Sequence, residues 1–167
     1  MANVFDKLVG TEHIVCESSL LHATYGGAKI RDLIMDKDRD NGTIVGRSAV
    51  TTSYKDVQAF TAKDAAAGEP VFLLLTVPMG YNTARKAYTD EKYFYNAKDE
   101  IARAYQLEAE DIFTVSEMAI TPSASPGPVV GHYVKFDNAT MKFIESTSAP
   151  ASGICIAQII EESNGKQ

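Results

Sequence analysis

The chain of 167 residues is long enough for one domain with a buried core. Hydrophobic residues make up 45% of it and charged residues 23%, which is ordinary for a globular protein and excludes a disordered chain. The formal net charge is −6, and the 16 basic residues form no cluster among 22 acidic ones. The electrostatic surface of a nucleic-acid-binding protein is therefore missing.

The first 27 residues show little regular pattern apart from a strand candidate at residues 13–16. We expect an N-terminal arm here, which becomes ordered against a neighbouring molecule. The chain begins without the basic and apolar regions of a secretory signal. Its longest apolar run, residues 71–77, is far shorter than the roughly 20 residues that span a bilayer. We therefore expect no membrane association, and synthesis in the cytoplasm.

The next elements are short strand candidates separated by turns. Residues 28–35 alternate weakly, and Asn41-Gly42 precedes the apolar Thr43-Ile-Val-Gly. Because Asn-Gly is typical of two-residue hairpin loops, we predict that this turn joins two paired strands. Residues 46–60 supply one or two further strands. Residues 71–77 are apolar on both faces and bounded by prolines, which predicts a central strand buried on both sides.

Residues 79–98 are rich in tyrosine, with Tyr81, Tyr88, Tyr93 and Tyr95 among them. Tyrosine provides a large contact area at a small entropic cost and is enriched at binding surfaces. The same rings would serve equally well in the domain's own core. The sequence leaves both interpretations open.

The stretch over residues 99–120 has the longest regular pattern. Residues 99–107 fit either a strand or a helix capped by Asn96, and these alternatives stay open. The following segments are predicted as a strand at 112–115, a proline-rich loop at 121–128, a hairpin from 129–136 and 141–144, and a buried strand at 154–160.

Many short strands with Gly and Pro turns, and no alternation of strand and helix, predict a mainly β fold. We expect a single-domain β-barrel or sandwich of short strands with at most one or two short helices. The expected organisation is a loosely structured N-terminal arm with a short strand over residues 1–27, a β-rich core domain over 28–162 and a flexible tail over 163–167.

The predicted core consists of four of these strands. Large-to-small changes there should be strongly destabilising, and we place Leu74 and Ile156 near the centre. The strands are residues 71–77, 112–115, 130–136 and 154–160.

Three aspartates at alternate positions, Asp36, Asp38 and Asp40, resemble the start of a calcium loop. An EF-hand needs Gly at its sixth position and Glu at its twelfth, and this chain has Asn41 and Arg47 there. Both requirements fail. A solvated turn is the better interpretation.

The sequence also lacks the patterns of a zinc site and of nucleophilic catalysis. Glu12, His13, Cys16 and His22 lie close in sequence, but their spacing matches no regular zinc site. No nucleophile elbow or glycine-rich phosphate loop occurs. The two cysteines, Cys16 and Cys155, permit a disulfide, but two reduced thiols are the better interpretation for this chain. We expect no metal, no cofactor and no enzymatic activity.

Three segments together resemble small structural proteins of tailed-bacteriophage heads, the decoration, cement or auxiliary capsid proteins. They begin at Lys63 (KDAAAGEPVFLL), Glu100 (EIARAYQLEAEDIFTVS) and Gly153 (GICIAQIIE), and the resemblance touches about half of the chain. Glu110 stands before Asp111, where a turn glycine would be expected. The resemblance implies a β-rich, non-enzymatic protein that clamps neighbouring capsid subunits.

The resemblance also implies partners and a location. The partners would be the major capsid protein and neighbouring copies on the lattice, on the virion surface, after assembly in the host cytoplasm. Alternatives are a phage tail or neck component, or a small β-barrel enzyme or ligand-binding protein. The candidate partner-binding residues are Val4, Phe5 and Leu8 of the arm and Tyr81, Tyr88, Tyr93 and Tyr95.

Overall fold

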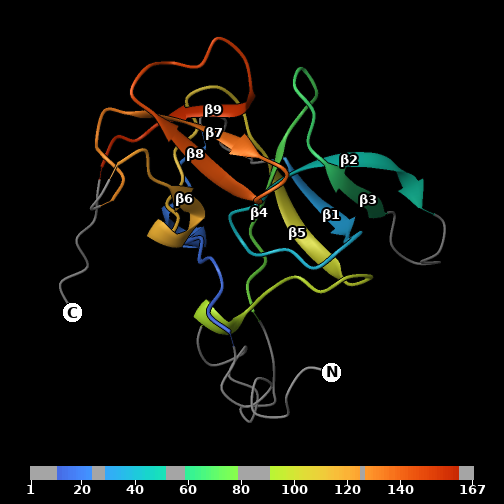
Figure 1. Cartoon of the computed structure of the whole chain (residues 1–167). Coiled ribbons are helices and arrows are strands. Elements are labelled where there is room, and N and C mark those ends of the chain that lie inside the picture. The colour runs from blue at the N-terminus through green and yellow to red at the C-terminus, as the bar shows by residue number, and fades with distance from the viewer. Residues whose placement is uncertain (1–10, 24–28, 52–58, 79–90, 125–126, 162–167) are drawn as a thin grey trace.

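The computed structural model describes residues 11–23, 29–51, 59–78, 91–124 and 127–161. It contains a closed five-stranded barrel and, beside it, a four-stranded sheet (Figure 1). The prediction of a mainly β fold is confirmed, with a barrel and a second sheet. Helical structure in these ranges is limited to 3-10 turns, which are η1 (Ser18–Leu20), η3 (Glu91–Tyr93) and η4 (Glu117–Ala119).

The barrel strands follow the order β1-β3-β2-β4-β5 and close through β5 and β1. Only β1 and β3 pair in parallel, and every other pair is antiparallel. The strands are β1 (Ile30–Ile34), β2 (Ile44–Thr51), β3 (Ala59–Asp64), β4 (Phe72–Leu74) and β5 (Ile101–Gln106).

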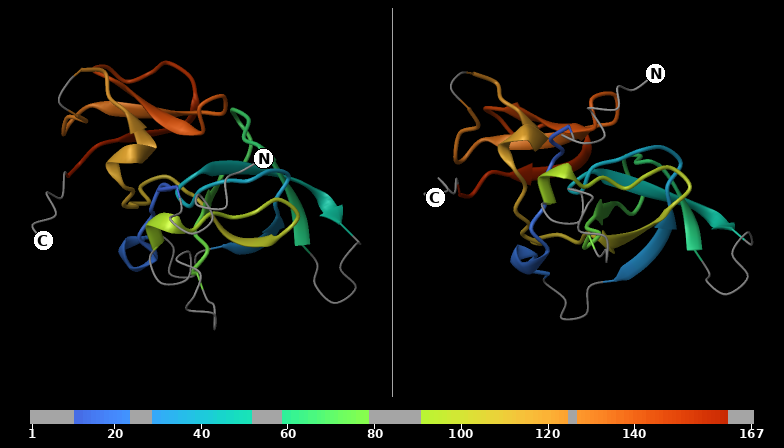
Figure 2. Two further views of the ribbon diagram at one scale, coloured as in Figure 1. Left: turned by 60° about the horizontal axis from the view of Figure 1, so that its bottom comes forward. Right: turned by 90° about the horizontal axis from the view of Figure 1, so that it is seen from below.

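The four-stranded sheet has the order β6-β8-β7-β9. Its central pair, β7 and β8, is the predicted hairpin. In Figures 1 and 2 this sheet (orange to red) lies to one side of the barrel. The strands are β6 (Ile120–Thr121), β7 (Tyr133–Asp137), β8 (Lys142–Ser146) and β9 (Ile154–Gln158).

Strand β4 belongs to two hydrophobic cores at once. Phe72 and Leu74 point into the barrel, where they pack with Leu33 and others. Leu73 and Leu75 point the other way and join a second cluster between the barrel and the four-stranded sheet. Because side chains alternate along a strand, a strand between two cores must be apolar on both faces. The predicted strand with two buried faces is confirmed over Phe72–Leu74, but it is shorter than residues 71–77, and Val77 is 45% exposed.

The undecided segment at 99–107 forms a strand, β5, which pairs with β1 on one side and β4 on the other. Its buried positions alternate, with Ala102 and Ala104 pointing into the barrel. Asn96 caps no helix, because its side-chain amide donates to the carbonyl of Arg39 and to the side chain of Asn41. Tertiary pairing overrides the helix propensity of the alanine-rich sequence.

The predicted hairpin at Asn41-Gly42 is wrong, because β1 pairs with β3 and β5 and not with β2. The Asn41 side chain instead exchanges two hydrogen bonds with the backbone of Thr76. Gly42 has a φ of +80°, and a Cβ built there would lie 3.0 Å from Val115 and 3.3 Å from Cys16. This glycine serves a close approach of chain segments rather than a two-residue hairpin.

Two core assignments are also wrong. Ile156, expected at the centre, is 43% exposed, because the face of β9 that packs inward carries Cys155 and Ala157. Because side chains alternate along a strand, a shift of one residue in the predicted pattern exchanges the buried and the exposed face. Residues 112–115 form no strand, only isolated bridges at Ile112 and Val115.

The N-terminal segment over residues 11–23 packs onto the domain itself. In place of the expected strand it makes isolated bridges, with Cys16 opposite Val115 and His22 opposite Ile112. Ile14 and Cys16 are buried in the cluster between the barrel and the sheet. The other parts of the predicted arm, residues 1–10 and 24–27, lie outside the described residues, as do 162–167 at the C-terminal end.

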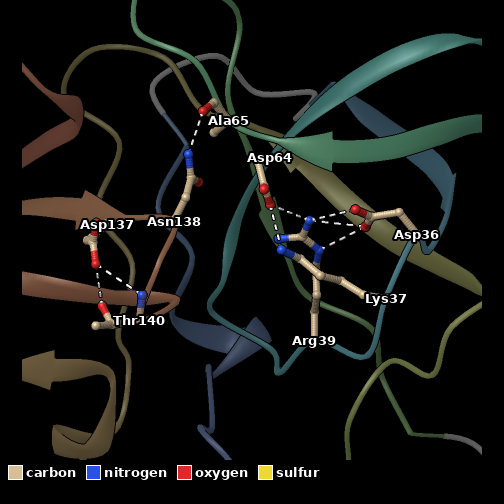
Figure 3. A network of polar contacts seen from close by, with 8 residues as sticks. All are labelled: Asp36, Lys37, Arg39, Asp64, Ala65, Asp137, Asn138 and Thr140. Carbon is tan, nitrogen blue, oxygen red and sulfur yellow. Dashed lines mark hydrogen bonds and ion pairs between the residues drawn. The ribbon is translucent and has the colours of Figure 1, made fainter.

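A buried arginine ties the β1–β2 connection to the end of β3. Arg39 donates from Nε and Nη2 to the carboxylate of Asp36, and from Nη2 to Asp64 at 2.8 Å (Figure 3). Its side chain is fully buried, whereas both carboxylates are partly exposed. Nearby, Asn138 of the β7–β8 turn donates to the carbonyl of Ala65, which links the four-stranded sheet to the barrel (Figure 3).

The contribution of Asp64 to stability should depend on pH. Hydrogen bonds from Lys37 and then Arg39 hold the pKa of Asp64 below its usual 3.8. A lowered folded-state pKa gives stability that is present above the unfolded-state pKa and is lost as the pH falls through the folded-state value. Asp64→Asn should therefore lower the melting temperature at neutral pH, and the difference from wild type should shrink below pH 3.8. A difference that stays constant down to acid pH would contradict this.

Glu145 of β8 holds the proline-rich loop against the sheet. Its buried carboxylate accepts the N–H groups of Ser123 at 2.7 Å and Val129 at 2.9 Å and lies 2.6 Å from Nδ1 of His132. Burial alone would raise the pKa of Glu145. The hydrogen bonds outweigh that effect and lower the pKa below its ordinary 4.5.

Glu145→Gln should destabilise the protein by about 2 kcal/mol, the typical value for hydrogen bonds to a charged group. Glutamine keeps one acceptor oxygen, but its NH₂ group would face a backbone N–H that needs an acceptor. Urea denaturation followed by circular dichroism measures the loss, with Glu161→Gln at an exposed position as the control. Equal midpoints for the two variants would show that the carboxylate is not needed.

Candidate functional site

An open groove of about 970 Å³ lies between the segment that follows β5 and the edge strand β9. Residues 107–117 form one wall, and residues 155–161 form the other. Val134 of β7 and Phe143 of β8, both buried, lie at its base. Two walls about 40 residues apart in sequence thus meet because β7 and β8 place β9 beside the 107–117 segment (Figure 2).

Large apolar side chains along this groove are exposed to water. Ile112 on one wall is 43% exposed, and Ile156 and Ile160 on the other are 43% and 59% exposed. Single exposed apolar residues are ordinary on protein surfaces, but here three exposed isoleucines line the same groove. Covering them would gain hydrophobic free energy, so the groove is suited to binding an apolar partner.

The groove is acidic at its rim. Its lining includes Glu108, Glu110, Asp111, Glu117 and Glu161, and none of the described lining residues is Lys, Arg or His. One rim carboxylate, that of Glu108, is paired with Lys29 at 2.9 Å. The rim therefore presents a negative potential above an apolar floor.

The turn before Asp111 adopts a backbone conformation that favours glycine. Glu110 has a φ of +73°, in the left-handed region. This is the position where the resemblance to capsid proteins led us to expect a turn glycine. The turn is formed here with a glutamate, and this residue lines the groove.

Strand β9 has one unpaired edge within the described residues. It pairs with β7 alone, because it is the last strand in the sheet order β6-β8-β7-β9. Ile159 donates its N–H to the carbonyl of His132 on the β7 side. Because backbone groups alternate between the two edges of a strand, those of Gln158 point away from β7. The edge thus presents backbone donors and acceptors beside the groove.

Of the predicted partner-binding residues, the structure describes Tyr93 and Tyr95. Tyr93 is half-buried and Tyr95 is 40% exposed, and neither lines the groove. The Tyr95 ring lies 5.0 Å from the ring of His13, and the backbone N–H of His13 donates to the carbonyl of Lys92. The described start of the chain and the tyrosine segment therefore meet. The remaining candidates, Val4, Phe5, Leu8, Tyr81 and Tyr88, lie outside the described residues.

The residues considered for metal binding have other partners. His13 and the N–H of Ile14 bind the Asp40 carboxylate, and Asp38 accepts the N–H of Lys98. Asp36 binds Arg39. In the part of the chain that the structure describes, no three His, Cys, Asp or Glu side chains gather as a metal site would require.

Both cysteines are free. Cys16 lies in the core cluster, and Cys155 lies at the base of β9 beside the groove. Burial is the main cause that raises the pKa of each thiol to about 12, from an ordinary 9.0. Neither thiol is activated as a nucleophile, because the reactive species is the thiolate.

Both thiols should therefore resist alkylation in the folded protein. Iodoacetamide at neutral pH should leave Cys16 and Cys155 unmodified over a time in which the urea-unfolded chain is labelled at both positions. Mass spectrometry of the intact protein counts the adducts. Rapid labelling of Cys155 in the folded state would show that β9 opens, and failure to label the unfolded chain would reveal a disulfide.

Comparisons with known proteins identify no relative: no family model, no curated protein and no solved structure matches the chain. Among the described residues, no helix has the length and apolar character needed to cross a membrane.

The sequence contained one signal of the groove. Residues 154–160 were predicted to form a buried strand, although Gln158 interrupts the apolar run. In the structure only one face is covered, and the face with Ile156 and Gln158 is exposed. The polar residue marked the exposed face.

Proposed function

We propose that this chain is a non-enzymatic structural protein that binds the outside of a bacteriophage capsid lattice and stabilises it. The groove beside β9 is the observation that supports this most directly. It offers exposed isoleucines and an unpaired strand edge, which are features of a surface for another protein. The virion and the major capsid protein as partner come from the resemblance of the three sequence segments.

The chemistry of the groove also favours binding over catalysis. Its charged groups are all carboxylates, at the rim, and its one thiol, Cys155, has a pKa raised by burial. An acyl-transfer or acid–base site needs a base held beside a nucleophile or proton donor. The described His side chains with carboxylate contacts, His13 and His132, lie outside the lining.

Two other functions remain as alternatives. A small-molecule-binding protein is favoured by the volume of the groove, about 970 Å³, which falls within the usual range of ligand pockets. A tail or neck component of the same virion would use the same surface on another particle. These alternatives differ in what the protein binds.

Sedimentation tests the proposal. The purified protein is mixed with heads, and separately with tails, of the phage that encodes it, and each mixture is centrifuged through a density gradient. We expect the wild-type protein to move with the heads. The double variant Ile156→Glu, Ile160→Glu should stay at the top, because it puts charge on the apolar wall of the groove.

A matched control is Ile30→Glu, which changes an isoleucine of similar exposure, 44%, on strand β1 of the barrel. This variant should still move with heads. Wild-type protein that stays at the top with heads would reject the proposal. Movement with tails alone would replace it by the tail or neck alternative.

A further inference from the structure

We propose that the groove takes an extended segment of the partner protein, which adds a strand to the free edge of β9 and carries lysine or arginine beside alternating apolar side chains. This inference deepens the proposed function, on which it rests for the identity of the partner. It assigns the mode of binding and the chemistry of the segment that is bound.

The strand edge determines the conformation of the occupant. The described residues leave the outer edge of β9 unpaired, and Gln158 directs its backbone N–H and C=O to that side. A helix satisfies its own backbone groups and has none to give, whereas an extended segment can pair with the edge. Cys155 has a φ of +45°, so regular pairing is available over residues 156–158 of β9, about 10 Å.

The apolar surface determines half of the side chains of the occupant. Ile156 on β9, Ile160 two residues beyond its end and Ile112 on the opposite wall are exposed at the groove. Side chains of a bound strand point alternately to its two faces. One face of the added strand would lie beside Ile156 and Ile160 on the exposed side of the sheet, and it must therefore carry apolar side chains.

The rim determines the charge of the occupant. Five carboxylates line the groove with no basic side chain among the described lining residues, in a chain whose net charge is −6. A segment carrying Asp or Glu would be repelled, and Lys or Arg would find a partner. Of the possible occupants, a second copy of this acidic chain is disfavoured by the same argument.

Binding of synthetic peptides to the full chain tests this. The probe is Lys-Val-Thr-Val-Lys-Val-Lys, blocked at both ends and fluorescently labelled, and the matched peptide has Glu in place of each Lys. Fluorescence anisotropy measures affinity, and NMR chemical shifts of ¹⁵N-labelled protein locate the site. The lysine peptide should bind at least about tenfold more tightly and shift the amides of residues 154–160.

Three variants separate edge pairing from charge. Gln158→Pro removes the outward N–H, and proline is tolerated on edge strands, while Gln158→Ala removes only the side chain, which donates to the carbonyl of Gly131. The proline variant should bind the lysine peptide at least about tenfold more weakly than the alanine variant. The third variant combines Glu110→Gln, Glu117→Gln and Glu161→Gln. It should bind the lysine peptide about tenfold more weakly than wild type and lose most of the salt dependence of binding.

Any of three results would overturn the inference. The two peptides bind equally, the chemical-shift changes are confined to another surface, or the proline and alanine variants bind with equal affinity at unchanged melting temperature. A concentration-dependent dimer in analytical ultracentrifugation that Gln158→Pro dissociates would also overturn it, since the edge would then belong to a second copy. Peptide binding without sedimentation on phage heads would uphold this mode of binding and reject the capsid role.

Discussion

Replacing Leu74 by alanine should lower the free energy of unfolding by about 3–5 kcal/mol. Leu74 is completely buried inside the barrel, on the strand that separates the two cores. Alanine would leave a cavity there, and the neighbouring strands β2 and β5 are fixed by their backbone pairing with β4. A site that cannot collapse around a cavity loses packing energy as well as burial.

Urea denaturation measures this loss, and Ile156→Ala provides the comparison. Ile156 is 43% exposed, so its truncation should change the free energy of unfolding by about 1 kcal/mol or less. The sequence placed both residues in the core, and the two variants therefore test the revised assignment directly. Similar losses in both variants would mean that the outer face of β9 is covered in solution.

Removing both carboxylates that face Arg39, in the double variant Asp36→Ala, Asp64→Ala, should cost about 3 kcal/mol or more. The guanidinium is fully buried, and Asp36 and Asp64 are the acidic partners that the structure gives it. Without them a positive charge would remain in the interior with most of its donors unsatisfied. One guanidinium nitrogen, Nη1, already has no hydrogen-bond acceptor among the described residues.

Adding Arg39→Met to the double variant should restore part of the stability. Methionine removes the buried charge and fills similar space, which is often neutral or stabilising relative to a buried ion pair. The melting temperatures of the double and triple variants are compared at neutral pH. If the triple variant is the less stable of the two, Arg39 acts mainly through packing rather than through its charge.

The parts of the fold that the sequence predicted are those where local pattern and final environment agree. Strand β4 was identified because both of its faces are apolar and both are buried. The β7–β8 hairpin followed from two short strands around Asp137-Asn138. The two strands of that hairpin are neighbours both in sequence and in space, whereas β4 is recognised by its composition alone and pairs with β2 and β5.

The wrong or undecided predictions concern segments whose structure depends on residues far away in the sequence. Asn41-Gly42 has the composition of a hairpin turn, but its glycine is required by Val115, more than 70 residues later. Strand β5 was undecided because its alanines favour a helix until β1 and β4 are placed beside it. The groove itself was not predicted, since its two walls are brought together only by the hairpin between them.

The pairing of the first described segment with residues 112–116 also has a consequence for synthesis. Val15 donates its N–H to the hydroxyl of a serine 101 positions further along, and Cys16 bridges Val115. Ribosomes add about 5–20 residues per second, so these partners follow about 5–20 s after the segment itself. Ile14 and Cys16 thus leave the ribosome with nothing native to cover them. This segment can therefore reach its native place only after residues 112–116 have been made.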